Sequence, residues 1–321
     1  MSVLEYQNPA TIEETLNLLD RYGKKAVLVA GGTDIIVLVK KKAISPEVLI
    51  SLQGVSGLNQ IEQDETLRIG PAVTHRTIEK SPLIRRNFTA LTDAVDVLGS
   101  VQIRNVGTIG GNICTAAPSA DTAPPLLVLG TEIKIKSAKG ERTVPLKGFF
   151  KGPGITVLGD GEIVTELTIP VPLPNTASAY WKHQRRQALD LPILGVAVLI
   201  SLNKNCLSDP AILDSSQPIS TIFQSLESEK LVCEEVRIAL GVAAPVPMRA
   251  LKAENLLRGQ AISRELLDEV AQIASEEAQP RDSLRGEAWY RREMIKVFVK
   301  RMALTCIDRI IGERKKSSAL C

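Results

Sequence analysis

Apolar side chains recur along the chain with two different spacings, which predict a mixture of helices and strands. Between residues 11 and 22 the apolar positions fall three or four apart, and Thr11 with Glu14 forms a capping box, so this segment predicts a helix. Short apolar runs bounded by glycine, proline or charge predict strands. Helices are expected at 11–22, 74–79, 82–98, 254–258, 263–278 and about 286–314. Strands are expected at 26–30, 48–52, 67–69, 132–137, 163–169, 179–182, 193–202 and 236–242.

The length of 321 residues allows two or three domains. Three closely spaced prolines, Pro170, Pro172 and Pro174, mark the expected boundary. Residues 203–235 are hydrophilic and poorly patterned, which predicts loops and one helix. The expected domains are 1–175, with subdomains of about 1–55 and 56–175, and 176–321.

Composition limits the possible functions. The five cysteines all lie more than ten positions apart and only two histidines are present, so CxxC metal motifs and local iron–sulfur runs are excluded. A net charge of +3 and 3% aromatic residues give no basis for nucleic-acid binding. No apolar run reaches the length of a membrane span, and the N-terminus does not resemble a signal peptide, so we expect a cytoplasmic protein.

Two glycine-rich stretches predict a site for a phosphate-bearing cofactor. The stretch 104–121 contains three glycines among small and hydroxyl side chains, and the stretch 27–34 contains a glycine pair. Such loops leave backbone N–H groups uncovered for an anion. Each stretch alone fits a tight turn equally well, but each also carries hydroxyl groups and a carboxylate, Asp34 or Asp121. The spacing Gly-x-x-Gly-Gly does not match GxGxxG, which disfavours a Rossmann nicotinamide site.

Several segments together resemble one protein family. They are Ala30–Ile35, Val106–Asp121, Gly161–Pro170, Lys182–Asp190 and Gly241–Arg249. In this order they resemble the FAD-binding medium subunits of the xanthine dehydrogenase family of molybdenum hydroxylases. That family includes subunits of carbon monoxide dehydrogenase, nicotinate dehydrogenase and 4-hydroxybenzoyl-CoA reductase. The resemblance covers nearly the whole chain.

The resemblance implies an α+β fold. A two-part FAD-binding domain of the vanillyl-alcohol-oxidase-like (PCMH) type would be followed by a smaller α+β C-terminal domain. FAD would sit on this chain, with molybdopterin on a large partner and [2Fe–2S] clusters on a small partner, in a dimer of heterotrimers. Electrons would pass through FAD to NAD or another acceptor. The substrate and the terminal acceptor are left open by the sequence.

The resemblance also implies site residues by position. One FAD loop would contain Leu28, Val29, Ala30, Gly31, Gly32, Thr33, Asp34 and Ile35. The other would contain Thr108, Ile109, Gly110, Gly111 and Asn112. Asp121 would meet the ribose or adenine side, and Val164 would pack on the adenosine portion. Leu98 would lie by the flavin ring, and Lys182 would contact the cofactor near the flavin.

The polar run from Lys182 to Asp190 allows two interpretations. It can be a solvated end of a strand. Alternatively, Lys182, Arg185 or Arg186 supplies a cation that raises the tendency of the flavin to accept electrons, with Asp190 orienting an arginine through a forked pair.

Two further residues are expected to play no chemical part. Cys114 is expected to be a small buried side chain beside the cofactor, and no four-cysteine cluster insert follows it, so FAD is expected to be the redox centre of this chain. His75 is expected at the surface or at a helix start. Two alternative functions stay open, a stand-alone FAD oxidase of the same fold and a scaffold or assembly protein without flavin.

Overall fold

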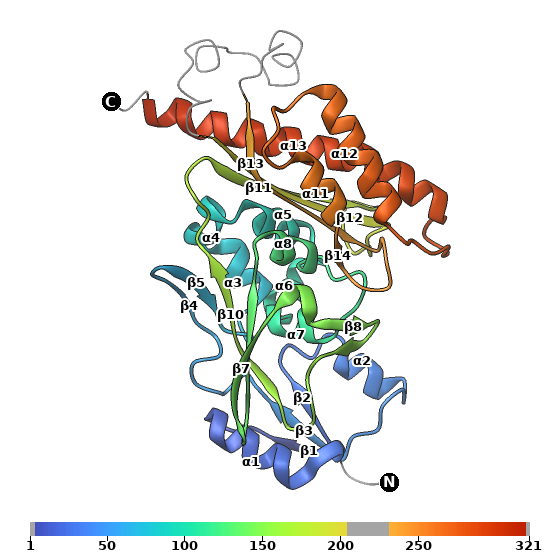
Figure 1. Cartoon of the computed structure of the whole chain (residues 1–321). Helices are drawn as coiled ribbons and strands as arrows, with labels where there is room; N and C mark the ends of the chain where they lie inside the picture. The colour runs from blue at the N-terminus through green and yellow to red at the C-terminus, as the bar shows by residue number, and fades with distance from the viewer. Residues whose placement is uncertain (1–3, 204–230, 319–321) are drawn as a thin grey trace.

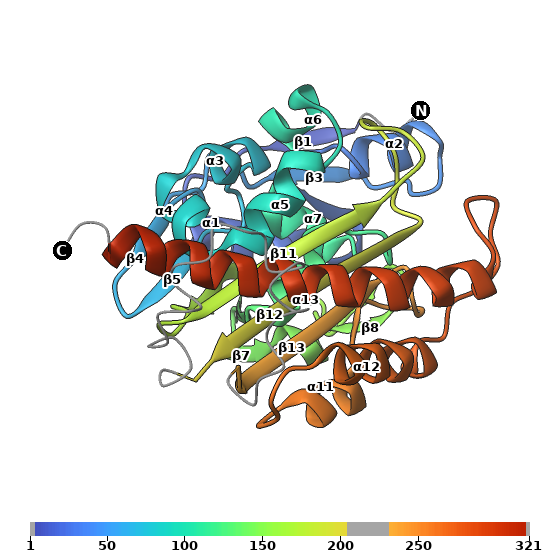
Figure 2. The same cartoon turned by 90° about the horizontal axis from the view of Figure 1, so that it is seen from above.

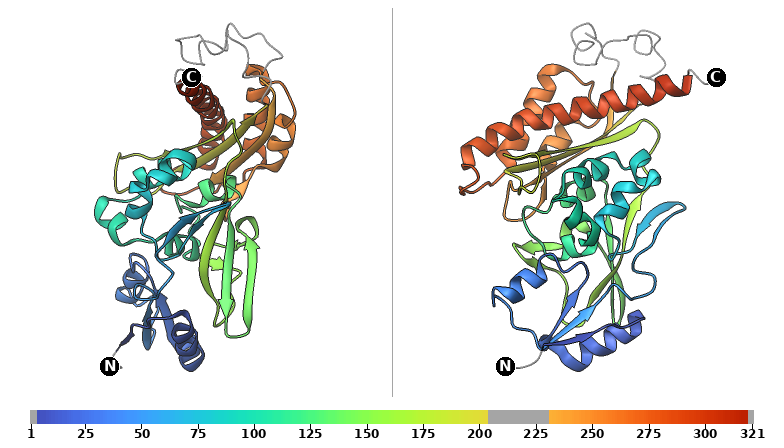
Figure 3. Two further views of the ribbon diagram at one scale, coloured as in Figure 1. Left: turned by 90° about the vertical axis from the view of Figure 1, so that its left-hand side faces the viewer. Right: turned by 180° about the vertical axis from the view of Figure 1, so that it is seen from behind.

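The computed structural model describes residues 4–203 and 231–318. Residues 204–230, which hold most of the segment expected as loops and one helix, lie outside the described residues. Figure 1 shows three units stacked along the molecule, with the N-terminal unit at one end and the C-terminal unit at the other. Figure 3 shows the same stacking from the side and from behind.

The first unit is a small parallel sheet with two helices. Thr11 caps its first helix as predicted, since the Thr11 Oγ1 accepts a hydrogen bond from the Glu14 N–H at 3.1 Å. The Glu14 carboxylate reaches one residue further than a capping box requires and accepts from the Ala10 N–H. The strands run in the order β1-β3-β2. The elements are β1 (Glu5–Gln7), α1 (Ile12–Tyr22), a 3-10 turn (Gly23–Lys25), β2 (Ala26–Val29), α2 (Ile35–Lys40) and β3 (Val48–Ser51).

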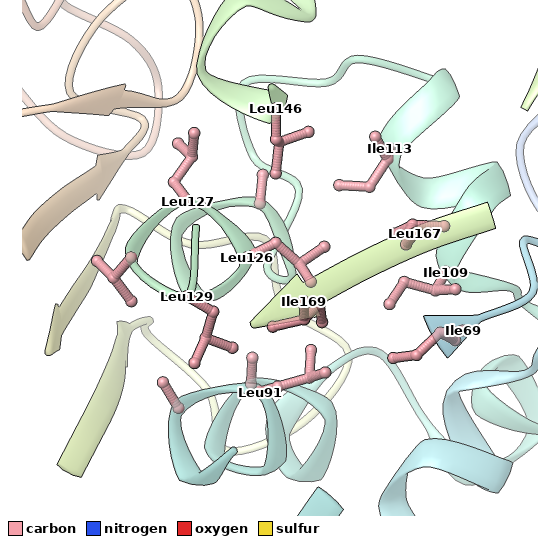
Figure 4. Close-up of a cluster of buried hydrophobic side chains, with 14 of the residues drawn as sticks. Ile69, Leu91, Ile109, Ile113, Leu126, Leu127, Leu129, Leu146, Leu167 and Ile169 are labelled. Atoms are coloured by element: carbon pink, nitrogen blue, oxygen red, sulfur yellow. The ribbon is translucent and has the colours of Figure 1, made fainter. Parts of the chain in front are cut away.

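The second unit packs a five-stranded antiparallel sheet against short helices. Figure 4 shows Ile69, Leu167 and Ile169 of the sheet facing apolar side chains of the helices. The strand order is β4-β5-β10-β6-β7. The strands are β4 (Ile61–Gln63), β5 (Thr66–Ile69), β6 (Glu132–Ser137), β7 (Gly140–Pro145) and β10 (Ile163–Pro170). The helices are α3 (His75–Lys80), α4 (Pro82–Asn87), α5 (Thr89–Val97), α6 (Val101–Val106), α7 (Ile109–Cys114) and α8 (Ala123–Val128). A 3-10 turn (Leu146–Gly148) and the hairpin β8 (Phe150–Gly152) and β9 (Ile155–Thr156) complete this unit.

The third unit is an antiparallel sheet covered on both faces. One face packs on α5 and α8, and the other is crossed by the long C-terminal helix (Figure 2). This explains why all nine residues of the central strand β12 are buried and why its sequence is a continuous apolar run. The strand order is β11-β12-β13-β14. The elements are β11 (Thr176–His183), β12 (Leu194–Leu202), β13 (Cys233–Gly241), β14 (Met248–Arg249), α11 (Leu251–Leu257), α12 (Arg264–Glu277) and α13 (Ala288–Ser318).

The predicted strands and the helices expected at 11–22, 263–278 and 286–314 are confirmed, with ends shifted by a few residues. The single helix expected at 82–98 is instead divided into α4 and α5, because Phe88 has a non-helical backbone. In the last helix Phe298, Met302 and Ile310 are buried and Met294 is partly buried. Pro170 ends β10, and Pro172 and Pro174 lie between β10 and β11. The division into the domains 1–175 and 176–321 stays a prediction. Within residues 4–203 and 231–318, every helix is too short or too polar to cross a membrane.

The glycine-rich stretch 104–121 is not the open loop that the sequence suggested. It contains the end of α6 and the whole of α7. The Oγ1 of Thr108 caps α7, and Ile109 and Ile113, four positions apart, bury one face of that helix in the core (Figure 4).

A buried ion pair anchors α11 to the sheet of the third unit. The side chain of Glu254 is almost fully buried. Its Oε1 accepts hydrogen bonds from the Ile238 N–H at 2.9 Å and from Arg249 Nε at 2.8 Å, and Arg249 Nη2 lies 2.5 Å from Oε2. Each oxygen of this carboxylate is therefore satisfied within the protein.

Replacing Glu254 with alanine should lower the free energy of unfolding by about 3 to 5 kcal/mol. The change leaves a largely buried guanidinium and a backbone N–H without their acceptor. Urea unfolding measures the effect. The exposed Glu269 of α12 provides the control, and its replacement with alanine should change stability by less than about 0.5 kcal/mol. Equal losses in the two variants would contradict the anchoring role.

Candidate functional site

A cavity of about 480 Å³ lies where the three units meet. Its walls come from the loop after β2, from the segment between α5 and Asp121, from the start of β10 and from the loop between β11 and β12. Most of the predicted site residues line this one cavity. They are Leu28, Ala30, Gly31, Gly32, Thr33, Asp34, Ile35, Leu98, Thr108, Gly110, Gly111, Asn112, Asp121 and Val164. Val29 and Ile109 are instead buried in the protein beside it.

The loop from Gly31 to Ile35 presents backbone donors to the cavity. Within the described residues, none of the five N–H groups of this loop has a hydrogen-bond acceptor. The chain takes this course because Gly32 has a φ of 72° and because a Cβ on Gly31 would lie only 2.1 Å from the Val106 carbonyl oxygen. The loop therefore offers a set of bare donors suited to an anion.

The amides of the second glycine pair are already used by the protein. The Gly110 N–H donates to the Pro71 carbonyl at 2.9 Å, and the Gly111 N–H donates to Thr108 Oγ1 at 3.1 Å. A Cβ on Gly110 would lie 2.4 Å from the Cβ of Pro71. The prediction of uncovered amides is thus wrong for this pair, because Gly110 serves close packing against Pro71.

Asp121 is a buried carboxylate held by two side chains of β11. The Tyr180 hydroxyl donates to Oδ1 at 3.0 Å, and Lys182 Nζ donates to Oδ2 at 2.8 Å. Burial raises the pKa of Asp121, although the lysine and the tyrosine both favour its charged form. Burial and the neighbouring carboxylate also raise the pKa of Tyr180 well above its usual value. Asp121 therefore reaches the cavity as one member of a buried polar cluster.

Lys182 lies behind Asp121. Its Nζ donates to the Val97 carbonyl at 3.3 Å as well as to Asp121. The resemblance placed Asp121 by the ribose or adenine and Lys182 by the flavin, yet the two side chains touch each other. Lys182 does not line the cavity itself, but its bond to the Val97 carbonyl places the lining residue Asp121 near Leu98.

The loop between β11 and β12 closes one side of the cavity. Asp190 Oδ2 accepts hydrogen bonds from the N–H groups of Arg185 and Arg186, at 3.0 and 3.3 Å. The guanidinium of Arg186 approaches only Oδ1, with its Nη2 at 3.9 Å. The predicted forked pair is therefore wrong, and Asp190 organises the backbone of the loop. Leu189, with a φ of 54°, donates its N–H to the Gly99 carbonyl and lines the cavity.

His75 is a lining residue that the sequence interpretation passed over. The expectation of a helix start is correct, because His75 is the first residue of α3. The alternative of a surface position is wrong, because the residue is only 2% exposed. Burial, with the Arg104 guanidinium nearby, lowers the pKa of His75 to about 4. The side chain is therefore a neutral imidazole at pH 7. A possible signal was the small residue at Gly107, which leaves room for the ring.

Arg104 is a buried cation that the sequence interpretation also missed. Its Nη1 donates to the Leu98 carbonyl at 2.9 Å, and its Nε donates to Glu79 Oε2 at 2.8 Å. Arg76 shares the same carboxylate at 2.7 Å. Arg104 thus fixes the backbone beside Leu98.

Cys114 lines the cavity and is partly buried. Burial raises the pKa of its thiol to about 12, so it is protonated at neutral pH. This agrees with the interpretation as a small side chain rather than a reactive thiolate. In the part of the chain that the structure describes, His, Cys, Asp and Glu form no group of three or more that could hold a metal ion.

Comparisons with known proteins agree with this arrangement. Residues 2–172 match the family described as the FAD binding domain in molybdopterin dehydrogenase, and residues 179–306 match the CO dehydrogenase flavoprotein C-terminal domain. The chain is 30% identical to the xanthine dehydrogenase FAD-binding subunit of Escherichia coli O157:H7, over 92% of this chain and 94% of that protein. It is 29% identical to the carbon monoxide dehydrogenase medium chain of Hydrogenophaga pseudoflava, with the same coverage of 92% and 94%.

The fold also matches a solved structure. The carbon monoxide dehydrogenase of Hydrogenophaga pseudoflava that lacks the Mo-pyranopterin moiety contains a chain that superposes with a TM-score of 0.82 at 29% identity. The match covers 94% of this chain and 96% of that chain. The resemblance seen in the sequence and the expected FAD-binding fold are therefore confirmed.

The neutral His75 should make the protein without cofactor sensitive to acid. The unfolded chain takes up a proton at this residue near pH 6.5, whereas the folded protein does so only near pH 4. The stability that comes from this difference in pKa is fully present above pH 6.5. It is lost as the pH falls from 6.5 to about 4, by at most about 1.4 kcal/mol per pH unit.

Urea unfolding between pH 6.5 and 4 tests this acid sensitivity. The variant His75→Gln cannot take up the proton, so its free energy of unfolding should fall less steeply than that of the wild type. His183→Gln is the matched control, because His183 is less buried and its pKa is less strongly lowered. Parallel curves for wild type and His75→Gln would show that His75 is not held neutral.

Proposed function

The chain belongs to the family of FAD-binding subunits of molybdopterin dehydrogenases, and from this we propose that it passes electrons through FAD within a heteromeric molybdenum hydroxylase. The electrons come from [2Fe–2S] clusters on a small partner subunit and leave to NAD or another acceptor. A large partner carries the molybdopterin and oxidises the substrate, in a dimer of heterotrimers. The names of two relatives support an assembly with other subunits. One is the medium chain of a carbon monoxide dehydrogenase, and the other is the FAD-subunit of the nicotinate dehydrogenase of Eubacterium barkeri.

The first loop fits the pyrophosphate of FAD. The five unpartnered N–H groups from Gly31 to Ile35 face a large cavity, and such a set of donors suits two linked phosphates. The proposed binding of FAD rests on these donors. The second glycine pair contributes shape instead of donors, since Gly110 lets α7 approach Pro71 and so sets the width of the cavity.

The flavin ring fits the end of the cavity beside Leu98. When bound, FAD supplies a ring that accepts and releases electrons. Leu98 and Leu189 offer apolar contacts to a ring, and Asp121 offers a hydrogen-bond acceptor whose charge is balanced by Lys182. We therefore move Asp121 from the adenosine side to the ring side, and keep Val164 for the adenosine portion.

Reconstitution with FAD tests the proposed function. The purified chain should bind one FAD and show flavin absorbance, and it should co-purify from its native source with an iron–sulfur subunit and a molybdenum-containing subunit. An isolated chain that binds FAD and oxidises an organic substrate unaided would instead favour a stand-alone oxidase. A purified chain that binds no FAD would contradict the proposed function.

Replacing Asp121 with asparagine should raise the midpoint potential of bound FAD. The change removes a negative charge and leaves Lys182 as an uncompensated buried cation, which favours the electron-rich form of the ring. A shift on the order of 30 mV corresponds to roughly 1.4 kcal/mol for two electrons. The exposed Asp20 of α1 provides the control, and Asp20→Asn should leave the potential unchanged. A potential that stays constant in Asp121→Asn would place the ring elsewhere.

A further inference from the structure

We infer that His75 binds the cofactor directly, donating a hydrogen bond from its Nε2–H to a phosphate oxygen of the FAD pyrophosphate. This inference rests on the proposed function and adds a side-chain contact to the backbone donors of the first loop. Nothing in the family match or in the resemblance assigns a role to this residue.

The position of the ring is the first reason. His75 lines the cavity although its side chain is almost completely buried. A Cβ on Gly107 would lie 3.3 Å from the Cδ2 of His75 and 3.8 Å from its Nε2. The missing side chain at residue 107 therefore leaves this edge of the imidazole uncovered.

The unmet hydrogen bonds of the ring are the second reason. Nδ1 is buried and has no partner within the described residues. Nε2 also has no protein partner within the described residues, but unlike Nδ1 it is accessible to solvent. An N–H shut away without an acceptor is costly, so the single proton of the neutral ring belongs on Nε2, where a ligand can accept from it.

The neighbourhood of Gly107 identifies the acceptor as phosphate. A Cβ on Gly31 would lie 2.8 Å from the Cα of Gly107, so the first loop and His75 meet at the same glycine. The backbone N–H of His75 also donates to the Gly107 carbonyl at 2.9 Å. The bare amides of the loop and the imidazole donor therefore converge on one region of the cavity.

The charged groups around the ring agree with an anionic ligand. Arg104 of α6 is the cation that acts on His75, and Glu79 of α3 is paired with Arg104 and with Arg76. This cluster of two arginines and one glutamate carries a net positive charge. A pyrophosphate bound beside His75 would oppose the effect of Arg104 and raise the pKa of the imidazole by roughly 1 to 3 units.

Nuclear magnetic resonance tests this contact, because the chain has only two histidines. The imidazole signals of the free and FAD-bound protein are titrated with acid, and His183→Gln assigns them. The His75 pKa should rise on binding FAD, and the phosphorus signals of bound FAD should move with pH through the same transition. In His75→Gln those phosphorus signals should no longer titrate.

Affinity measurements supply a second arm. Gln keeps an N–H near the position of Nε2, whereas Leu keeps bulk but no donor. His75→Leu should weaken FAD binding by about 10-fold or more, and His75→Gln should restore most of it. Circular dichroism shows whether the Leu variant folds. If it does not fold, the phosphorus titration of wild type and His75→Gln tests the contact instead.

The outcomes separate this inference from the proposed function. If the wild-type chain binds no FAD, the proposed function itself fails. If FAD binds while the His75 pKa and the phosphorus signals stay unlinked, only the contact is wrong. Equal FAD affinity in His75→Leu and wild type would also overturn it.

Discussion

The close approach of two backbone segments at Gly31 is the constraint on which the rest of this site depends. A side chain at residue 31 would lie 2.1 Å from the Val106 carbonyl oxygen, so only glycine lets the first unit dock on the helical layer of the second. This docking places the bare amides after β2 opposite α7 and leaves the cavity between them. The sequence assigns Gly31 to the ligand, but this glycine is also required for the packing of the two units.

Buried and partly buried charges then fix the third unit against the second. Lys182 and Tyr180 belong to β11, yet both donate to Asp121 of the second unit. Arg309 of α13 forms a further bridge, with its two terminal nitrogens each 2.9 Å from an oxygen of Asp93 in α5. Removing one partner from such a pair leaves a charge uncompensated, so these contacts favour one placement of the units.

Much of the fold could be predicted from local pattern. The alternation of apolar and polar residues in β6 and the continuous apolar run of β12 are both visible in the sequence, and Thr11 caps its helix through a contact between near neighbours in the chain. The short helix α7 could not be predicted in this way, because two glycines occupy it and its stability comes from Ile109 and Ile113 in the core. The resemblance to a family brought most of the lining residues together.

Three features of the site required the folded structure. The contact between Asp121 and Lys182 joins residues 61 positions apart, so spacing gives no sign of it. The pairing of Asp190 with backbone N–H groups instead of a guanidinium depends on the course of a short loop. The position of the His75 ring depends on a residue without a side chain at 107, because a Cβ there would lie 3.3 Å from the Cδ2 of the ring. In each case the contact is set by tertiary packing and not by the local sequence.

A crystal structure of the chain with FAD bound would locate both ends of the cofactor in the cavity. We expect both phosphates to lie against the N–H groups of residues 31–35, with the flavin ring at the end of the cavity beside Leu98 and Asp121. Phosphates bound at the N–H groups of Gly110 and Gly111, or a ring at the opposite end beside Val164, would contradict this placement.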